Sequence, residues 1–163
     1  MKVRRVTPAE QERYRAFRLR ALAEDPAAFG RALAEEQAFP PEEWTRRLTR
    51  PGVATFVAEE ADAWLGMAGA GLHVEGPPEV FGMWVAPEAR SRGVGLALLD
   101  ACAAWAREQG ATRLTLWVNL AQAPALRLYR KAGFAPEGEP MRGTRDPTRV
   151  FQSMTKALEP DAD

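Results

Sequence analysis

Residues 83–96, MWVAPEARSRGVGL, place two arginines and two glycines between an apolar run and an amphipathic run. Glycine lets the backbone approach a ligand closely. A helix expected from Val94 offers unpaired N–H groups and the positive end of its dipole to an anion. Arg90 and Arg92 can add charge-assisted hydrogen bonds to phosphate oxygens. The segment predicts an anion-binding loop; a plain strand-to-helix turn with solvated arginines has the same pattern.

Two common phosphate-binding loops are excluded. A P-loop needs Gly-Lys followed by Ser or Thr, and the chain has no such run. A dinucleotide-binding fingerprint needs a third glycine, where this chain has Leu98. The loop therefore belongs to neither class.

A second motif lies at residues 116–134, LWVNLAQAPALRLYRKAGF. The R-x-x-G-x-G pattern of the first loop, after a strand ending in MWVAPEAR, resembles the GNAT superfamily of acetyl-CoA-dependent N-acetyltransferases. The ending A-L-x-L-Y-x-K-x-G-F is similar to the second cofactor segment of that family. The order of the predicted elements also matches the family over nearly the whole chain.

The resemblance implies that the fourth strand splays from the fifth and that the pantetheine arm of acetyl-CoA lies in the gap. Backbone groups of Met83, Trp84 and Val85 would pair with its amides, and one N–H would polarise the thioester carbonyl. Gln122 stands where many members carry Asn, so its contact with pantetheine stays open. The pyrophosphate would be held by the loop residues Arg90, Ser91, Arg92, Gly93, Val94 and Gly95.

The resemblance also implies a general acid, because Tyr129 matches the family tyrosine that hydrogen-bonds the cofactor sulfur. A half-buried helix aromatic is the alternative for Tyr129. Glu79 opens the fourth strand where some members hold a catalytic glutamate, so it is the first candidate base, with a solvated surface residue as the alternative. His73 is a weaker candidate. Glu35 and Glu36 are expected to contact substrate or to lie on the surface.

The remaining polar candidates have structural alternatives. Asn119, at the end of a predicted strand, could face either the cofactor or the substrate. Cys102 lies among alanines inside the helix that follows the loop, which favours a small core residue over a nucleophile. The tryptophans other than Trp84 are expected to be core residues or pocket walls.

The elements that must position these residues follow from periodicity and from turn residues. Thr7 and Glu10 form a capping-box pattern at the first helix. The order predicts a mixed α/β domain, and the resemblance implies a central, mostly antiparallel sheet flanked by helices. One domain is expected over residues 1–158, with a short tail at 159–163. Strands are predicted at 2–6, 55–58, 64–72, 80–85, 113–118, from 134, and 150–155, and helices at 8–23, 40–50, 94–109 and 124–132, with 27–39 left ambiguous.

Composition narrows the function. The chain has 163 residues, with 22 Lys+Arg against 22 Asp+Glu, so it lacks the basic excess of a general nucleic-acid or membrane-surface binder. One cysteine and one histidine exclude a disulfide framework and Cys/His metal clusters. The single cysteine indicates a reducing, cytoplasmic location, and no targeting or membrane-spanning segment is recognised.

Together these features predict a cytoplasmic enzyme that moves an acetyl group from acetyl-CoA to a primary amine by direct attack, without a metal. The amine is unidentified and could belong to a small molecule or a protein. The alternative is a non-catalytic acyl-CoA-binding or sensor domain, and either a monomer or a homodimer is consistent. Residues 51–89 carry acids but no Lys or Arg, whereas 109–136 carry bases but no acid. This segregation predicts that the acidic side attracts a cationic amine.

Overall fold

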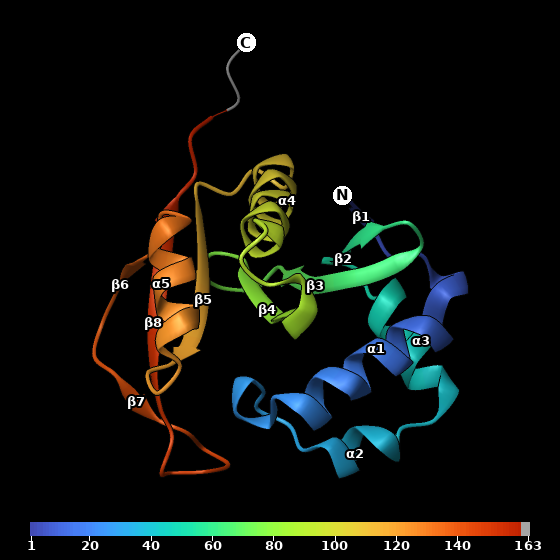
Figure 1. The fold of residues 1–163 in the computed structure, drawn as a ribbon. Coiled ribbons are helices and arrows are strands. Elements are labelled where there is room, and N and C mark those ends of the chain that lie inside the picture. Colours follow the sequence, from blue (N-terminus) through green and yellow to red (C-terminus); the bar gives the residue numbers. More distant parts are fainter. Residues whose placement is uncertain (161–163) are drawn as a thin grey trace.

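The computed structural model describes residues 1–160, and one eight-stranded sheet organises them (Figure 1). The strand order is β1-β2-β3-β4-β5-β8-β6, and β7 pairs with β8. All pairs are antiparallel except β4–β5, which is parallel. The strands are β1 (Lys2–Arg5), β2 (Val53–Glu60), β3 (Ala63–Gly71), β4 (Glu79–Val85), β5 (Arg113–Asn119), β6 (Ala135–Pro136), β7 (Met141–Arg142) and β8 (Val150–Ala157).

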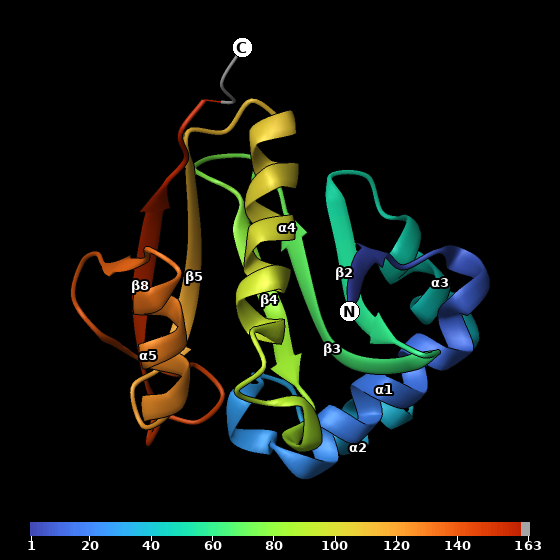
Figure 2. The ribbon, with the colours of Figure 1, turned by 45° about the horizontal axis from the view of Figure 1, so that its top comes forward.

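Helices cover both faces of the sheet (Figure 2). Helices α4 and α5 lie on one face, where they bury a core with Leu65, Ala68 and Leu116. Helices α1 and α3 lie on the other face, with Trp64 and Met67. Neighbouring β3 residues thus serve opposite cores, as the alternation of side chains along a strand requires. The helices are α1 (Gln11–Glu24), α2 (Leu33–Gln37), α3 (Pro41–Thr49), α4 (Val94–Glu108) and α5 (Ala123–Lys131), with 3-10 turns at Pro8–Glu10, Pro26–Ala28 and Pro87–Ala89.

The predicted start of the first helix is confirmed. The Glu10 carboxylate accepts hydrogen bonds from the Thr7 backbone N–H at 3.0 Å and from the Thr7 hydroxyl at 3.2 Å. The mixed α/β class and the predicted order of the long elements are confirmed as well. The predicted tail is described only at residues 159–160, and 161–163 lie outside the described residues.

One segment differs from its predicted form, one was left ambiguous, and one short strand was not predicted. The expected four-residue turn at 59–62 shrinks to Ala61 and Asp62, both at positive φ, because β2 and β3 extend into a two-residue hairpin. The ambiguous stretch 27–39 contains only the end of a 3-10 turn and the short α2. Strand β7 has two residues and was not predicted, because so short a strand carries no periodicity.

Gly69 of β3 leaves room for the Phe81 ring of the neighbouring strand β4. The register shifts between Met67 and Gly69, so that β4 bulges around Gly82, which has a φ of 61°. A Cβ on Gly69 would lie 2.5 Å from the Phe81 ring. Gly69 therefore leaves space for Phe81 and sets the bulge just ahead of Met83.

Candidate functional site

The central feature of the sheet is a gap between β4 and β5. The two strands pair at one position only, Glu79 with Thr115, and the Thr115 N–H donates to the Pro78 carbonyl at 3.0 Å. Beyond this point the two strands diverge toward Val85 and Asn119. A cleft of about 840 Å³ lies in the gap between them, and residues of α4 and α5 also line it. The predicted site residues that line the cleft are Met83, Trp84, Val85, Arg90, Ser91, Gly93, Val94, Gly95, Gln122 and Tyr129.

Val85 is the β4 residue whose backbone N–H points toward the cleft. The Ala86 N–H donates to the Leu65 carbonyl of β3 at 2.8 Å, so strand alternation turns the backbone groups of Val85 the opposite way. Arg90 Nε donates to the Val85 carbonyl at 3.0 Å, which leaves the Val85 N–H toward the cleft. The backbone of Trp84 faces β3.

The Trp84 side chain belongs to the core. It is 3% exposed, and its ring meets Phe17 of α1 edge to face at 5.3 Å. Trp84 therefore anchors β4 on α1, while its neighbours in sequence present groups to the cleft.

The loop before α4 offers a row of unpaired donors. Ser91 and Gly93 both have positive φ, at 63° and 80°. Within residues 1–160, the backbone N–H groups of residues 91–96 donate to no protein acceptor, and the N-cap Gly93 brings no side-chain cap. Consecutive N–H groups at the start of a 15-residue helix form a cradle for an anion.

Gly95 has a packing role as well. A Cβ at this position would lie 2.8 Å from Leu128 Cδ2 on α5 and 3.2 Å from Met83 Cε on β4. The absence of a side chain therefore lets α4, α5 and β4 approach around the cleft. This accounts for the second glycine of the loop motif.

The two loop arginines have different positions. Arg90 lines the cleft, and its guanidinium also lies 3.8 Å from Asp25. Arg92 does not line the cleft, because its Nη2 binds Glu60 at 2.9 Å. The structure therefore brings the loop backbone and Arg90 together, and holds Arg92 outside that group.

Tyr129 supplies a hydroxyl to the cleft. The side chain is 8% exposed, and its ring packs edge to face on Phe134 at 6.2 Å. Burial, with a smaller contribution from Cys102, raises the pKa of Tyr129 to about 12. No hydrogen bond to the Tyr129 hydroxyl is found within residues 1–160. A protonated phenol without a protein partner has a proton available for donation.

Cys102 is a core residue, as its alanine neighbours indicated. It is fully buried, and burial raises the pKa of its thiol to about 12. A thiol that stays protonated is a poor nucleophile.

Gln122 and Asn119 connect the cleft to the segment after α1. Gln122 Nε2 donates to Asp25 Oδ1 at 3.4 Å, and Asn119 Nδ2 donates to the Ala27 carbonyl at 3.2 Å. The Asn119 carbonyl oxygen also accepts the Ala121 N–H at 3.0 Å. These bonds hold residues 25–28 as one wall of the cleft.

The carboxylates that the sequence offered as site candidates lie apart from one another. Glu79 lines neither this cleft nor the cavity described below, and it lies 3.1 Å from His73. Glu36 is fully buried and binds Arg18 at 2.9 Å and Arg47 at 2.7 Å, so the expectation of a substrate contact or surface residue is wrong for it. Its carboxylate instead ties α1, α2 and α3 together.

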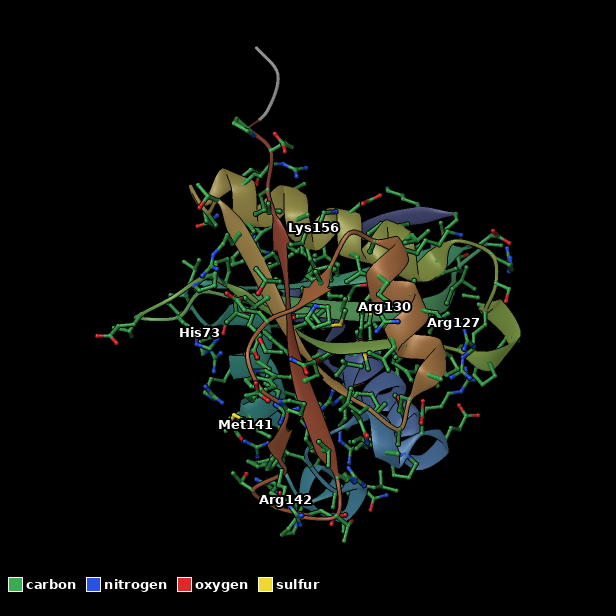
Figure 3. The ribbon with its side chains drawn as sticks, turned by 90° about the vertical axis from the view of Figure 1, so that its left-hand side faces the viewer. His73, Arg127, Arg130, Met141, Arg142 and Lys156 are labelled. Carbon is green, nitrogen blue, oxygen red and sulfur yellow. The ribbon has the colours of Figure 1, made fainter. Side chains whose placement is uncertain are left out.

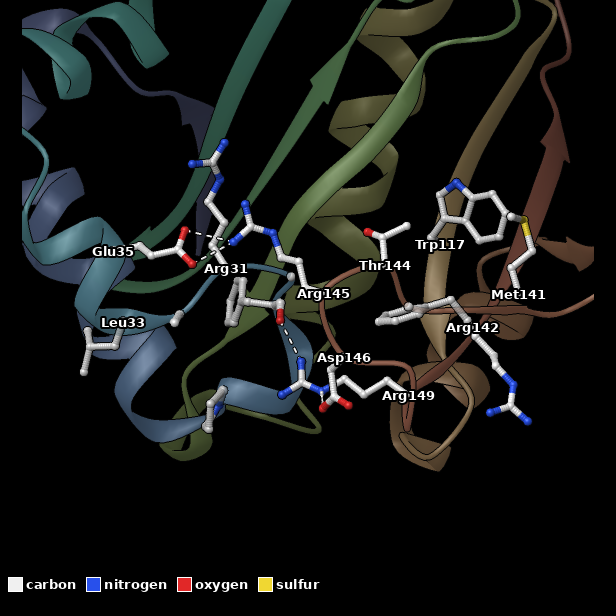
Figure 4. Close-up of a pocket in the computed structure, with 16 residues that line it drawn as sticks. Arg31, Leu33, Glu35, Trp117, Met141, Arg142, Thr144, Arg145, Asp146 and Arg149 are labelled. Atoms are coloured by element: carbon white, nitrogen blue, oxygen red, sulfur yellow. Dashed lines mark hydrogen bonds and ion pairs between the residues drawn. The ribbon is translucent and has the colours of Figure 1, made fainter.

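A second cavity of about 830 Å³ adjoins the cleft (Figure 4). Residues 26–35 form one side of it, and β7 with the loop that follows forms the other. Trp117 and Phe151 line both the cavity and the cleft, so the two spaces meet at β5 and β8. Of the candidate residues, only Glu35 lines this cavity. Trp117, expected to be a core residue or a pocket wall, also lines the cavity, and the remaining lining residues belong to neither sequence motif, because segments far apart in the chain assemble them.

Among residues 1–160, no group of three or more His, Cys, Asp or Glu side chains could hold a metal ion. No helix in this part of the chain is long and apolar enough to cross a membrane.

Comparison with known proteins agrees with this geometry. The chain matches the model of the Acetyltransferase (GNAT) family over residues 14–134. The IAA acetyltransferase of Azospirillum brasilense is 33% identical over 105 residues, which cover 64% of this chain and 69% of that protein. The mycothiol acetyltransferase of Thermobispora bispora is 31% identical over 134 residues, which cover 77% of this chain and 43% of that protein.

Solved structures share the fold at lower identity. A GNAT-family acetyltransferase from Streptococcus pneumoniae has a TM-score of 0.82 at 20% identity, over 97% of this chain and 99% of that chain. The structure of yncA from Salmonella typhimurium with its cofactor acetyl-CoA has a TM-score of 0.79 at 20% identity, over 100% of this chain and 96% of that chain. Since the family model spans most of the sequence, this chain belongs to the GNAT family of acetyltransferases and is an acetyl-CoA-dependent acyltransferase.

Proposed function

We propose that this enzyme transfers the acetyl group of acetyl-CoA to a primary amine by direct attack of the amine nitrogen. The observation that carries the proposal is the continuity of the two spaces. The cleft holds the N–H cradle of residues 91–96 and the Tyr129 hydroxyl, and it meets the second cavity at Trp117 and Phe151. Donor and acceptor can therefore enter from separate sides and meet between β4 and β5.

The residues present fit a nucleotide thioester. Unpaired N–H groups and Arg90 suit a pyrophosphate, and the Val85 N–H at the open strand edge suits an amide or thioester carbonyl. When bound, acetyl-CoA supplies an acetyl group activated as a thioester. Met83, Val85, the loop from Arg90 to Gly95 and Gln122 are the proposed binding residues. Arg92 and Trp84 are assigned supporting roles, since one is paired with Glu60 and the other packs on α1.

The chemistry needs two proton movements. The amine forms a bond to the acetyl carbon and loses a proton, while the carbon–sulfur bond breaks and the sulfur accepts a proton. We assign the second proton to Tyr129 Oη, because its raised pKa keeps the phenol protonated at neutral pH. A domain that only binds acyl-CoA needs no such donor, so the Tyr129 hydroxyl favours catalysis.

The base that accepts the amine proton is a separate question. Glu79 remains a proposed base. Because it lines neither cavity and lies 3.1 Å from His73, it reaches the amine only through a water molecule. Asp25 and Glu35 compete with it because each lines one of the two spaces. If Glu79 is the base, Glu79→Gln will remove the acidic limb of the pH–rate profile, and Asp25→Asn will leave that limb in place.

We further propose a cytoplasmic enzyme that acts as a monomer or homodimer. The chain has a single cysteine, Cys102, which is free and buried, and low cysteine usage without disulfides is typical of proteins in a reducing compartment. Light scattering across a concentration series measures the oligomeric state.

Thiol release from acetyl-CoA with a panel of amines tests the function, and calorimetry measures acetyl-CoA binding in parallel. The proposal predicts release that depends on both the enzyme and the amine. Tight binding of acetyl-CoA without release for any amine would instead indicate a sensor domain.

A further inference from the structure

The second cavity carries charges that indicate what kind of amine it accepts. Four arginines and two carboxylates line it: Arg31, Arg142, Arg145, Arg149, Glu35 and Asp146. Basic side chains are therefore in excess in this cavity. Residues 51–89, in contrast, contain acidic side chains and no Lys or Arg. Three acids of that segment are neutralised by ion pairs, Glu59 with Arg4, Glu60 with Arg92 and Glu88 with Arg20.

Three of the four arginines divide into fixed and available groups, and the fourth, Arg142, lies beside Met141 on β7 at the other end of the cavity (Figure 4). Arg149 is fixed, because Nη1 donates to the Phe29 carbonyl at 2.9 Å and Nε lies 3.4 Å from Asp146. Arg145 binds Glu35 through one nitrogen, at 2.7 and 2.9 Å, and both side chains are about half exposed. Arg31 has no carboxylate partner within residues 1–160, and its guanidinium lies over the Phe39 ring at 5.6 Å.

Figure 4 shows Arg31, Arg145 and Glu35 gathered at the α2 end of the cavity. Arg145 is paired with the half-exposed Glu35 carboxylate there, whereas Arg31 is not. An incoming carboxylate can pair with Arg31 and can compete with Glu35 for Arg145. Arginine is well suited to this, since its planar fork binds carboxylates with two hydrogen bonds.

Apolar surface lines the opposite end of the cavity. Trp117 and Met141 line this end, and they are 45% and 57% exposed. Figure 3 shows Met141 and Arg142 together on β7, at the edge of the sheet. Exposed apolar side chains that line a concave site are suited to an apolar group of a ligand.

We infer that the acceptor is a small primary amine that carries a carboxylate and an apolar side chain, the chemistry of an apolar amino acid. The inference rests on the proposed function and specifies its substrate. Arg31 and Arg145 bind the carboxylate, and Trp117 and Met141 contact the side chain. The amine then lies toward the junction with the cleft, where Trp117 lines both spaces. A polycationic amine meets an excess of like charge.

The test compares acceptors that differ only in the carboxylate: L-phenylalanine with phenethylamine, and L-leucine with isopentylamine, with spermidine as a polycation. The measured quantity is kcat/KM for thiol release. Amino acids and simple amines differ in amine pKa, so the ratio within each pair is compared between enzyme variants. Arg31→Gln and Arg145→Gln are expected to lower kcat/KM for the amino acids on the order of tenfold, through KM, and to leave the simple amines within about twofold.

Two further variants sharpen the result. Glu35→Gln frees Arg145, so the ratio of KM for each amino acid to KM for its matched simple amine should fall, and this ratio is independent of any effect of Glu35 on kcat. Arg50→Gln is the matched control, because Arg50 is an exposed arginine at the end of α3 and lines neither space.

The outcomes separate the two claims. Acetylation of simple amines or spermidine with ratios unaffected by Arg31→Gln and Arg145→Gln would overturn the inference and leave the proposed function standing. Acetyl-CoA binding without acetylation of any amine would overturn both. A tenfold loss confined to the amino acids supports both.

Discussion

Replacement of Tyr129 by phenylalanine removes one oxygen atom and leaves the packing of the ring unchanged. The ring is 8% exposed and lies 6.2 Å from Phe134, so its burial and its aromatic contact persist. The hydroxyl has no protein partner within residues 1–160, so its loss leaves no buried group unpaired. We therefore expect Tyr129→Phe to change the free energy of unfolding by less than about 0.5 kcal/mol.

The effect on catalysis is expected to be much larger. A positioned general acid contributes about 10²- to 10⁴-fold, so a loss of at least about a hundredfold corresponds to roughly 2.7 kcal/mol of transition-state stabilisation. The pKa of Tyr129, raised to about 12 by burial, keeps the wild-type phenol protonated across the working range. A thiol with an ordinary pKa of about 8.5 leaves as a stable thiolate at higher pH. The deficit of the variant should therefore shrink above about pH 9.

The assay is kcat/KM for thiol release from about pH 6 to pH 10, with thermal unfolding and acetyl-CoA affinity measured on the same samples. Tyr14→Phe is the matched control, since Tyr14 is the only other tyrosine, is also 8% exposed and lies in α1 against Trp44. An equal loss at every pH would refute the role of the phenol as proton donor. A similar loss in Tyr14→Phe would attribute the effect to packing.

Three further outcomes are expected. Gly95→Ala should raise KM for acetyl-CoA several-fold in steady-state assays with little change in unfolding temperature, because its Cβ, 2.8 Å from Leu128 Cδ2, pushes that flexible side chain into the cleft; an unchanged KM would contradict this. Glu36→Gln should lower the free energy of unfolding in urea by about 3–5 kcal/mol, because it leaves two arginines without their buried partner. Glu35 is half exposed, so Glu35→Gln should lower it by less than about 1 kcal/mol. Equal losses would refute a buried triad. Hydrogen bonds from Arg4 lower the pKa of Glu10 to about 2 from 4.5. The ionised Glu10 therefore stabilises the folded protein fully above about pH 4.5, and this contribution is lost as the pH falls toward 2. Glu10→Gln should flatten the measured dependence of unfolding free energy on pH in that window.

The long elements and the glycine-containing loop before α4 were predictable because local physics determines them. The capping box at Thr7 specifies where the first helix begins, and Gly110, directly after the predicted helix 94–109, has the positive φ of a helix-ending glycine. Gly93 likewise adopts the positive φ that a loop approaching an anion requires. Each of these features depends on residues adjacent in the chain, so periodicity and turn chemistry suffice.

The second cavity was not predictable, because its residues come from three separated segments. Arg31 follows a 3-10 turn, Trp117 lies in β5 and Met141 lies in a strand of two residues. Glu35 and Glu36 are neighbours in sequence, yet one lines this cavity and the other is fully buried with Arg18 and Arg47. The sequence could not distinguish them, because α2 is a single short turn whose facing depends on α1 and α3.

Mass spectrometry of the acceptor after incubation with the enzyme and acetyl-CoA tests the central claim most directly. The account predicts that the acceptor gains one acetyl group on its amine nitrogen, with one free thiol released for each amide formed and no acetyl group left on the enzyme. Thiol release with an unmodified acceptor, or an acetyl group retained on the protein, would contradict direct transfer between the cleft and the second cavity.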